Sequence, residues 1–282
     1  MLTLKLTLVP LFLLVVSMSG AWWGPSIAGW LAGLPVVAGP ILFLLVLEHG
    51  PAFGAHAALL ALAAILASEA FNFAYAWTCR ARGWPLPLAA GLAAWALAAT
   101  ALAHLPAPLA ASPWTAVIAA LGAVAFGRAF LPRSSAGAAS LPLARRDLAA
   151  RMAAGALLTL AVTAVSGRAG PAWSGVLAVF PLLGSVLAVS SHRAHGAAFA
   201  IALLRGMVLG RFSFVAFCLV LAFALRHATA ETAWLGFVAA SAVAMGVQWA
   251  TRRMARAQGV AGKVSATRAA EAVEAAAAQD AG

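Results

Sequence analysis

Long apolar runs alternate with short polar loops along the whole chain, and this pattern limits the possible folds more than any other feature. Several runs reach the roughly 20 residues that an α-helix needs to cross about 30 Å of hydrocarbon. A transmembrane β-barrel would instead show short segments of alternating polarity. We predict nine spans, at about residues 2–21, 25–47, 51–77, 85–104, 114–131, 148–166, 171–191, 197–225 and 232–250.

The composition agrees with an all-α polytopic membrane protein in contact with the lipid bilayer. Of the 282 residues, 64% are hydrophobic and 9% are charged, whereas a soluble domain has about 25% charged residues. The formal charge of +11 is spread over short loops and a tail, so we expect no nucleic-acid binding. Cys79 and Cys218 lack the spacing of metal ligands, and we expect neither a metal nor another cofactor.

The basic residues set the expected orientation through the positive-inside rule. With nine spans and the N-terminus outside, the outer side keeps only Lys5, Arg168 and Arg226. We therefore predict a cytoplasmic C-terminus, and the Ala-rich composition indicates the inner membrane of a bacterium. The residues expected inside are Arg80, Arg82, Arg133, Arg145, Arg146, Arg151, Arg193, Arg252, Arg253, Arg256, Lys263 and Arg268, with Arg128 near the same edge.

The first run also fits a cleaved signal peptide. "MLTLKLTLVPLFLLVVSMSGA" has a Lys, an apolar core and small residues near a possible cleavage point. A signal peptide starts inside, however, and with eight further spans it would place Arg80, Arg82 and the basic tail outside. Orientation therefore favours a retained first span.

Two stretches of the chain repeat each other. "GPSIAGWLAGLP" at residues 24–35 returns as "GPAWSGVLAVFP" at residues 170–181, an offset of 146 positions. The match continues through the pairs His49 with His195, Gly50 with Gly196 and Phe53 with Phe199. Ten of thirty positions agree without a gap, which is more than an Ala-rich composition alone is expected to give.

The repeat predicts two halves of opposite orientation. Spans 1–4 correspond to spans 6–9, and the odd number of spans between equivalent points turns the second half upside down. We predict a four-helix repeat at 1–104, a linker with the fifth span at 105–147, a second four-helix repeat at 148–250 and a cytoplasmic tail at 251–282. Inverted repeats of this kind are common in transporters that work by alternating access.

The core of each half resembles a known type of small membrane protein. "IAGWLAGLPVVAGPILFLLVLEHGPAFGA" has an Ile-Ala-Gly entry, a mid-helix Pro and a short charged turn that ends in Gly. In these features it resembles the GlpM-type inner-membrane proteins, which are single units. The resemblance implies two fused units of this type, and it implies no functional residue.

Proline and glycine near the middle of spans 2 and 7 predict helix breaks. Proline removes a backbone donor, and freed carbonyls at that depth must face protein or a polar cavity. The alternative is that the glycines serve close helix packing and the prolines are tolerated kinks. The predicted breaks are at Pro35, Gly39 and Pro40 in span 2 and at Pro181 and Gly184 in span 7.

Three ionisable residues lie deep in the predicted spans, namely Glu69 in span 3 and Arg205 and Arg211 in span 8. Such groups are costly in a bilayer and have a partner or a function. Residue counts from the cytoplasmic ends place Glu69 and Arg205 at equal depth, so we predict that they pair. Arg211, deeper by about 9 Å, shares Glu69, bonds to backbone carbonyls freed at Pro35 or Pro181, or binds an anionic substrate. Asn72 lies on the same face as Glu69.

We therefore predict a secondary transporter for a small anionic or amphipathic substrate, bound by Arg211, Glu69, Arg205 and Asn72. The alternative is a membrane component without transport activity that supports an envelope-biosynthesis system. We expect no enzymatic activity, because no metalloprotease, serine-hydrolase or phosphate-loop motif occurs and only one acid is deep in the membrane. The substrate and the oligomeric state do not follow from the sequence.

Overall fold

The computed structural model describes residues 2–35, 38–104, 112–134, 145–168 and 180–254. Every regular element in these ranges is a helix. In chain order they are α1 (Leu2–Trp23), α2 (Pro25–Ala32), α3 (Ala38–His49), α4 (Pro51–Thr78), α5 (Pro85–Ala103), α7 (Pro113–Phe130), α8 (Arg145–Arg168), α10 (Leu182–Arg226) and a last helix, Ala233–Met254.

Five of the described helices are long and apolar enough to cross a membrane. They are α4, α5, α7, α10 and Ala233–Met254. An all-helical chain with five such helices is a multi-pass membrane protein. The count of nine spans and the division into two repeats remain predictions, and part of the seventh predicted span lies outside the described residues.

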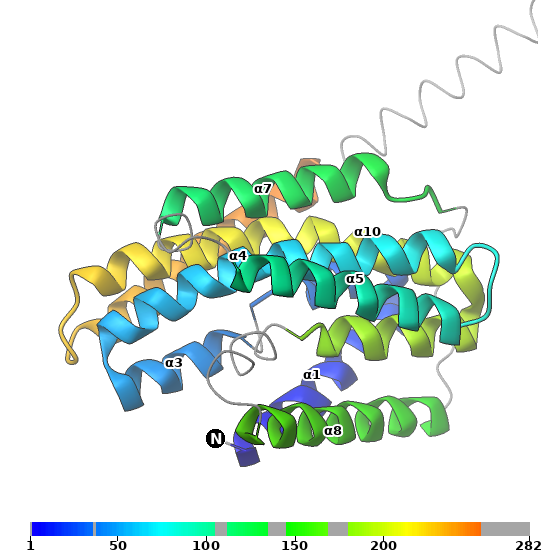
Figure 1. The fold of residues 1–282 in the computed structure, drawn as a ribbon, viewed down its shortest axis with the longest axis horizontal. Helices are drawn as coiled ribbons and strands as arrows, with labels where there is room; N and C mark the ends of the chain where they lie inside the picture. Colours follow the sequence, from blue (N-terminus) through cyan, green and yellow to red (C-terminus); the bar gives the residue numbers. More distant parts are fainter. Residues whose placement is uncertain (1, 36–37, 105–111, 135–144, 169–179, 255–282) are drawn as a thin grey trace, which may run out of the picture.

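The helices lie side by side along the long axis of the molecule (Figure 1). In this view α7 is at the top, α8 is at the bottom, and α4 and α10 run through the middle. α10 packs against α2, α4, α7 and α8, and α4 packs against α5 and α7 as well. These two helices therefore form the centre of the bundle.

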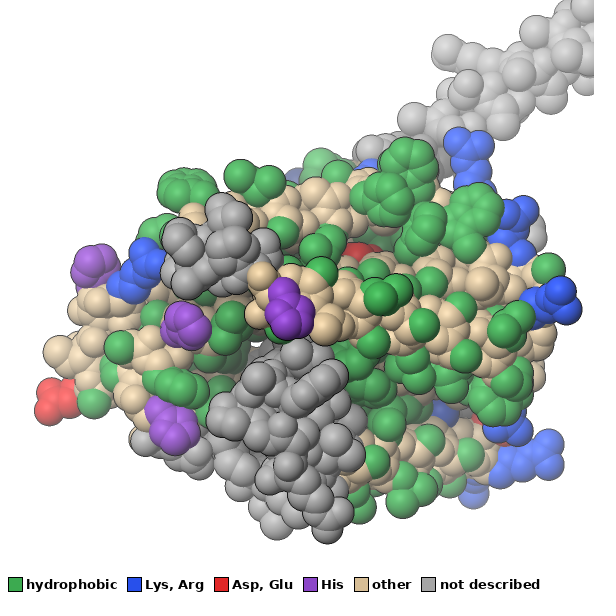
Figure 2. All heavy atoms as spheres, in the orientation of Figure 1, with side chains coloured by type: hydrophobic (Ala, Val, Ile, Leu, Met, Phe, Trp, Pro, Cys, Tyr) green, Lys and Arg blue, Asp and Glu red, His purple; other side chains and the backbone are tan. Residues whose placement is uncertain are grey.

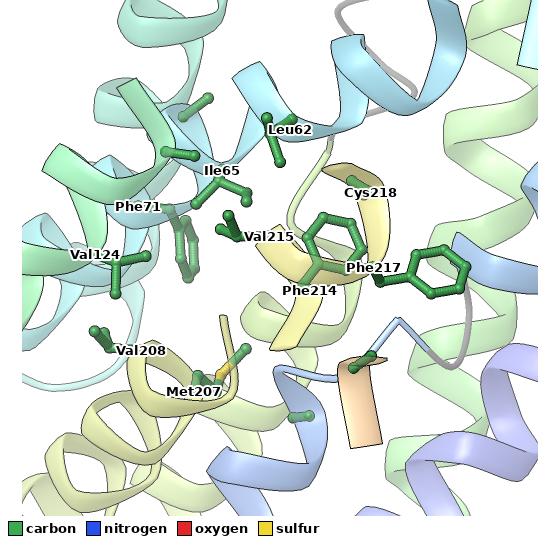
Figure 3. Packing of buried hydrophobic residues seen from close by; sticks show 14 of the residues in the cluster. Leu62, Ile65, Phe71, Val124, Met207, Val208, Phe214, Val215, Phe217 and Cys218 are labelled. Carbon is green, nitrogen blue, oxygen red and sulfur yellow. The ribbon is translucent and has the colours of Figure 1, made fainter. Parts of the chain in front are cut away.

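The core between the central helices is filled by large apolar side chains. Phe71 of α4, Val124 of α7 and Val208 of α10 are all buried and belong to this cluster (Figure 3). Further members shown there are Leu62, Ile65, Met207, Phe214, Val215, Phe217 and Cys218. Only helices with apolar faces toward both neighbours can occupy such a position, which explains why α4 and α10 are the most buried of the predicted spans.

The predicted second span is two helices. α2 ends at Ala32, and α3 begins at Ala38. Pro35 lies in the break, and its carbonyl oxygen accepts a hydrogen bond of 2.7 Å from the backbone N–H of Gly39. Gly39 and Pro40 lie in the first turn of α3, where a proline removes no hydrogen bond because the N–H groups there have no partner within the helix.

Pro181 and Gly184 lie at the start of α10. Pro181 is the residue before the helix, and Gly184 is in its first turn. The helix bends sharply at Gly196, whose φ of 82° and ψ of 177° are not helical. This bend separates the predicted spans 171–191 and 197–225, and the two parts of α10 run in opposite directions on either side of it (Figure 1).

The turn at Gly50 has the same backbone geometry as the bend at Gly196, its counterpart in the sequence repeat. Gly50 has φ 86° and ψ 169°, and Gly196 has φ 82° and ψ 177°. A residue with a side chain rarely adopts such a φ, which accounts for glycine at both positions. The α3–α4 turn is at the left end of Figure 1 and the bend of α10 is at the right end.

The aromatic contacts beside these two glycines also match. The His49 ring lies 4.7 Å from the Phe53 ring, with an angle of 51° between the planes. The His195 ring lies 4.6 Å from the Phe199 ring, with an angle of 46°. The repeated letters therefore encode one local structure at two places in the chain.

Most of the visible Lys and Arg side chains gather at one end of the molecule, whereas the visible His side chains lie toward the other end or near the middle (Figure 2). The basic end carries the loop between α4 and α5 and the bend of α10 (Figure 1). By the positive-inside rule we expect the basic end to face the cytoplasm.

This assignment predicts the sidedness of the loops. Reporter fusions after residues 82 and 268 are expected to be active in the cytoplasm, and a fusion after residue 108 is expected to be active only outside. A paired set of alkaline phosphatase and green fluorescent protein fusions measures whether each position lies outside or in the cytoplasm. A tail on the outer side would contradict the orientation and the inversion of the second half.

Candidate functional site

Glu69 and Arg211 form a buried ion pair between α4 and α10. The Nε of Arg211 donates to Glu69 Oε1 over 3.1 Å, and the two side chains are 15% (Arg211) and 4% (Glu69) exposed. Asn72, one helical turn after Glu69, donates from Nδ2 to both carboxylate oxygens over 3.2 Å. The structure therefore brings together three of the four predicted substrate-binding residues.

A glycine on α7 makes room for the carboxylate. A Cβ atom at Gly127 would lie 3.2 Å from Glu69 Oε2 and 3.3 Å from the methyl groups of Val208. A larger side chain at this position would press on the acid. Gly127 is a residue that the sequence analysis missed, although a glycine inside a predicted membrane helix is a known signal for close packing.

The predicted pairing of Glu69 with Arg205 is wrong. In a helix the Cα–Cβ bonds tilt toward the N-terminus. α4 is antiparallel to the part of α10 that follows Gly196 (Figure 1). The Glu69 side chain therefore leans away from the basic end, while both arginine side chains lean toward it. The Cα of Arg211 is farther from the basic end than that of Glu69, so its side chain extends toward the carboxylate. The side chain of Arg205 starts level with Glu69 and extends away from it.

Arg205 instead caps the C-terminus of α7. Its Nη1 donates to the carbonyl oxygens of Leu131 over 2.7 Å and Pro132 over 3.3 Å. The indole Nε1 of Trp77 donates to the carbonyl oxygen of Phe130 over 3.0 Å. The last carbonyls of a helix lack partners within it and carry a partial negative charge, so a cation is favourable there.

The break between α2 and α3 packs on α10 at Gly210, one residue before Arg211. Gly33, the first residue after α2, packs so closely on α10 that a Cβ atom on it would lie 2.6 Å from the Cα of Gly210. Gly210 precedes Arg211 in the chain. The described part of the structure shows no hydrogen bond from Arg211 to a carbonyl at Pro35 or Pro181. The contact of Gly33 with Gly210 is what brings the helix break close to the ion pair along α10.

Further polar groups lie two residues further along α10, at Ser213. The Ser213 hydroxyl donates to Gln248 Oε1 over 2.6 Å, and both residues are buried. Gln248 Nε2 and Trp30 Nε1 are buried without a partner among the described residues. Trp30 is in α2, and the guanidinium of Arg252 lies over its ring at 5.4 Å. The polar layer therefore extends from Glu69 across α10 to the last helix.

A second arginine escaped the sequence analysis as a site residue. Arg151 in α8 was expected only to contribute to the positive side of the membrane, but it is 4% exposed. Its Nη1 donates to the hydroxyl of Ser17 in α1 over 3.2 Å. The available signal was its position after the start of an apolar run, one turn beyond Asp147.

Comparisons of the chain with protein-family models, with curated proteins and with solved structures find no match. The resemblance to GlpM-type proteins therefore stays a prediction. Function must be inferred from the arrangement of the residues themselves.

Proposed function

We propose that the chain is a secondary transporter-like protein of the bacterial inner membrane, with a cytoplasmic C-terminus. It moves a small anionic or amphipathic substrate by alternating access. One observation carries the proposal: the break between α2 and α3 packs at Gly210, next to Arg211, whose partner is the buried Glu69. Transporter sites are typically built where membrane helices are interrupted near charged groups.

Arg211 has the chemistry to bind an anion while its ion pair persists. Only its Nε contacts Glu69, and its two Nη groups make no hydrogen bond to a described residue. A guanidinium presents several donors in one plane and can hold a carboxylate on one edge and a second oxyanion on another. Asn72 holds Glu69 in place for this arrangement.

Alternating access requires two units that rock against each other. The matched geometry of Gly50 and Gly196 at opposite ends of the bundle supports two inverted units, with the segment 105–147 as their connector. In such proteins the substrate lies between the repeats, near the middle of the membrane. Glu69 and Arg211 come from α4 and α10, which belong to different predicted halves.

Transport in proteoliposomes tests the proposal. Hexanesulfonate is a suitable probe because it is amphipathic and permanently charged, so it does not leak through the bilayer as a neutral acid. We expect uptake of the labelled probe above that of empty liposomes, and a loss of about tenfold or more for Arg211→Lys, which keeps the charge but loses the planar fork.

The control is Arg226→Lys, because Arg226 is an exposed arginine at the end of α10. Its uptake is expected to equal that of the unchanged protein. Uptake that is absent in the unchanged protein, or retained in full by a correctly folded Arg211→Lys variant, would contradict the proposal.

A further inference from the structure

A cavity of about 630 Å³ lies between α5, α8 and the first part of α10. Sites for small molecules have volumes of roughly 300–1,000 Å³. The lining of the cavity runs along α8 from Asp147 to Ala161, a length of about 21 Å at 1.5 Å per residue. One leaflet of a bilayer has a hydrocarbon depth of about 15 Å, so the cavity can hold an extended apolar chain.

The two ends of this cavity differ in chemistry. Asp147, Arg151 and Arg193 line the end near the start of α8. Phe180 lines the other end, before the start of α10, and its ring packs edge to face on Trp95 at 5.0 Å. The wall between them is mostly leucine, valine and alanine. This is the polarity of a molecule with one charged group and one apolar chain.

Arg151 is the feature that calls for a charged ligand. It is 4% exposed, and its Nη1 bonds to the hydroxyl of Ser17. Its Nε and Nη2 are buried without a partner among the described residues. Asp147 acts on it only from beyond ion-pair distance. A buried guanidinium with one neutral partner is costly. Nε and Nη2 have almost no accessible surface, so an oxyanion at this end of the cavity would offset part of that cost through its charge.

A smaller cavity beside Arg151 does not remove this need. Its volume is about 10 Å³, and Ser17, Arg151, Ser191 and His195 are among its lining residues. That space suits one water at most, since a water needs roughly 10–15 Å³. One water can bond to the unpartnered Ser191 hydroxyl and to one N–H of Arg151, but it brings no negative charge.

We propose that the cavity between α5, α8 and α10 binds a single-chain amphipathic anion. Its oxyanion group lies against the exposed Arg193, at the end of the cavity that Arg151 also lines, and its apolar chain extends toward Phe180. Arg193 is exposed and packs over the Trp84 ring at 5.6 Å, which holds its charge at the cavity mouth. None of the described residues that line this cavity belongs to the Glu69–Arg211 site, so the inference stands independently of the proposed function.

Ligand-induced thermal stabilisation tests the site on the full chain in phosphatidylcholine nanodiscs. Cys79 and Cys218 are buried free thiols, so a maleimide dye reacts with them only when the protein unfolds and thereby reports Tm. The probes are dodecyl phosphate, dodecanol and inorganic phosphate. We expect dodecyl phosphate at about 100 times its Kd to raise Tm by about 5 °C, and the other two to raise it by less than a third of that.

Three variants locate the binding. Arg151→Gln removes the buried charge, and Ala154→Trp fills the cavity from an exposed position on its wall. Both are expected to lose most of the shift. Arg226→Gln is the matched control and is expected to keep it. The cavity-filling variant keeps the test decisive should Arg151→Gln fold poorly.

Each remaining outcome has a definite reading. Equal shifts with dodecanol would overturn the anion part of the inference, and equal shifts with inorganic phosphate would replace the amphiphile with a free anion. No shift with any probe, or full shifts in Ala154→Trp, would overturn the site. Dodecyl phosphate binding without hexanesulfonate uptake would instead reject transport and leave the site standing.

Discussion

Glu69→Gln is expected to lower the free energy of unfolding by about 3 kcal/mol, because it leaves the Arg211 guanidinium buried without a counter-charge. The amide keeps the shape of the carboxylate, so packing against Gly127 is unchanged and the effect reports the charge. Unfolding in mixed micelles, driven by an increasing fraction of sodium dodecyl sulfate and followed by circular dichroism, measures it.

A double-variant comparison separates the ion pair from general damage. In Glu69→Gln/Arg211→Met the unpaired charge is gone, so this variant is expected to be more stable than Glu69→Gln alone by more than about 1 kcal/mol. Glu231→Gln, in the exposed turn before the last helix, is the control and is expected to change nothing. Strictly additive effects of the two substitutions would show that Glu69 and Arg211 do not interact.

The expected binding partner of Glu69 shows where sequence reasoning reaches its limit. Hydropathy and residue counts placed Glu69, Arg205 and Arg211 in two helices that do pack together. Counting along helices gives the depth of Cα atoms, however, and a long side chain displaces its charge toward the N-terminus of its helix. In two antiparallel helices this displacement brings Arg211, and not Arg205, to Glu69.

Local features were predicted more successfully than contacts across the bundle. Pro35 predicted a break in the second span, and the structure has one between α2 and α3. The repeated His and Gly letters mark turns of equal geometry. The position of Arg151 in an apolar run was a signal of burial, but its partner could not be predicted, because the contact depends on α1 folding against α8.

The contact between α2 and α10 rests on two pairs of glycines spaced four residues apart. Gly29 of α2 and Gly33, the residue that follows α2, face Gly206 and Gly210 on α10. Added Cβ atoms would overlap backbone atoms across the interface, including the carbonyl oxygens of Leu203 and Ser26. Spacing of this kind lets membrane helices approach until their backbones touch. Gly29 and Gly33 therefore serve close helix packing, and the same contact places the start of the helix break on α10 at Gly210.

Gly29→Ala is consequently expected to lower the free energy of unfolding by at least about 2 kcal/mol, even though alanine favours helix formation by about 1 kcal/mol over glycine. The Leu203 carbonyl that the new methyl group meets is backbone, so α2 and α10 must move apart. The same unfolding titration in mixed micelles measures the loss.

Gly246→Ala is the matched control, since Gly246 is in the last helix and a Cβ atom there meets nothing within 4 Å. It is expected to be neutral or slightly stabilising, so the difference between the two variants isolates the helix contact from helix propensity. The separation of α2 from α10 also displaces Gly33 and the break from Arg211. We therefore expect Gly29→Ala to reduce hexanesulfonate uptake even at temperatures where the protein stays folded. Equal stability of the two variants would contradict the glycine contact, and normal uptake in a destabilised Gly29→Ala would separate that contact from the site.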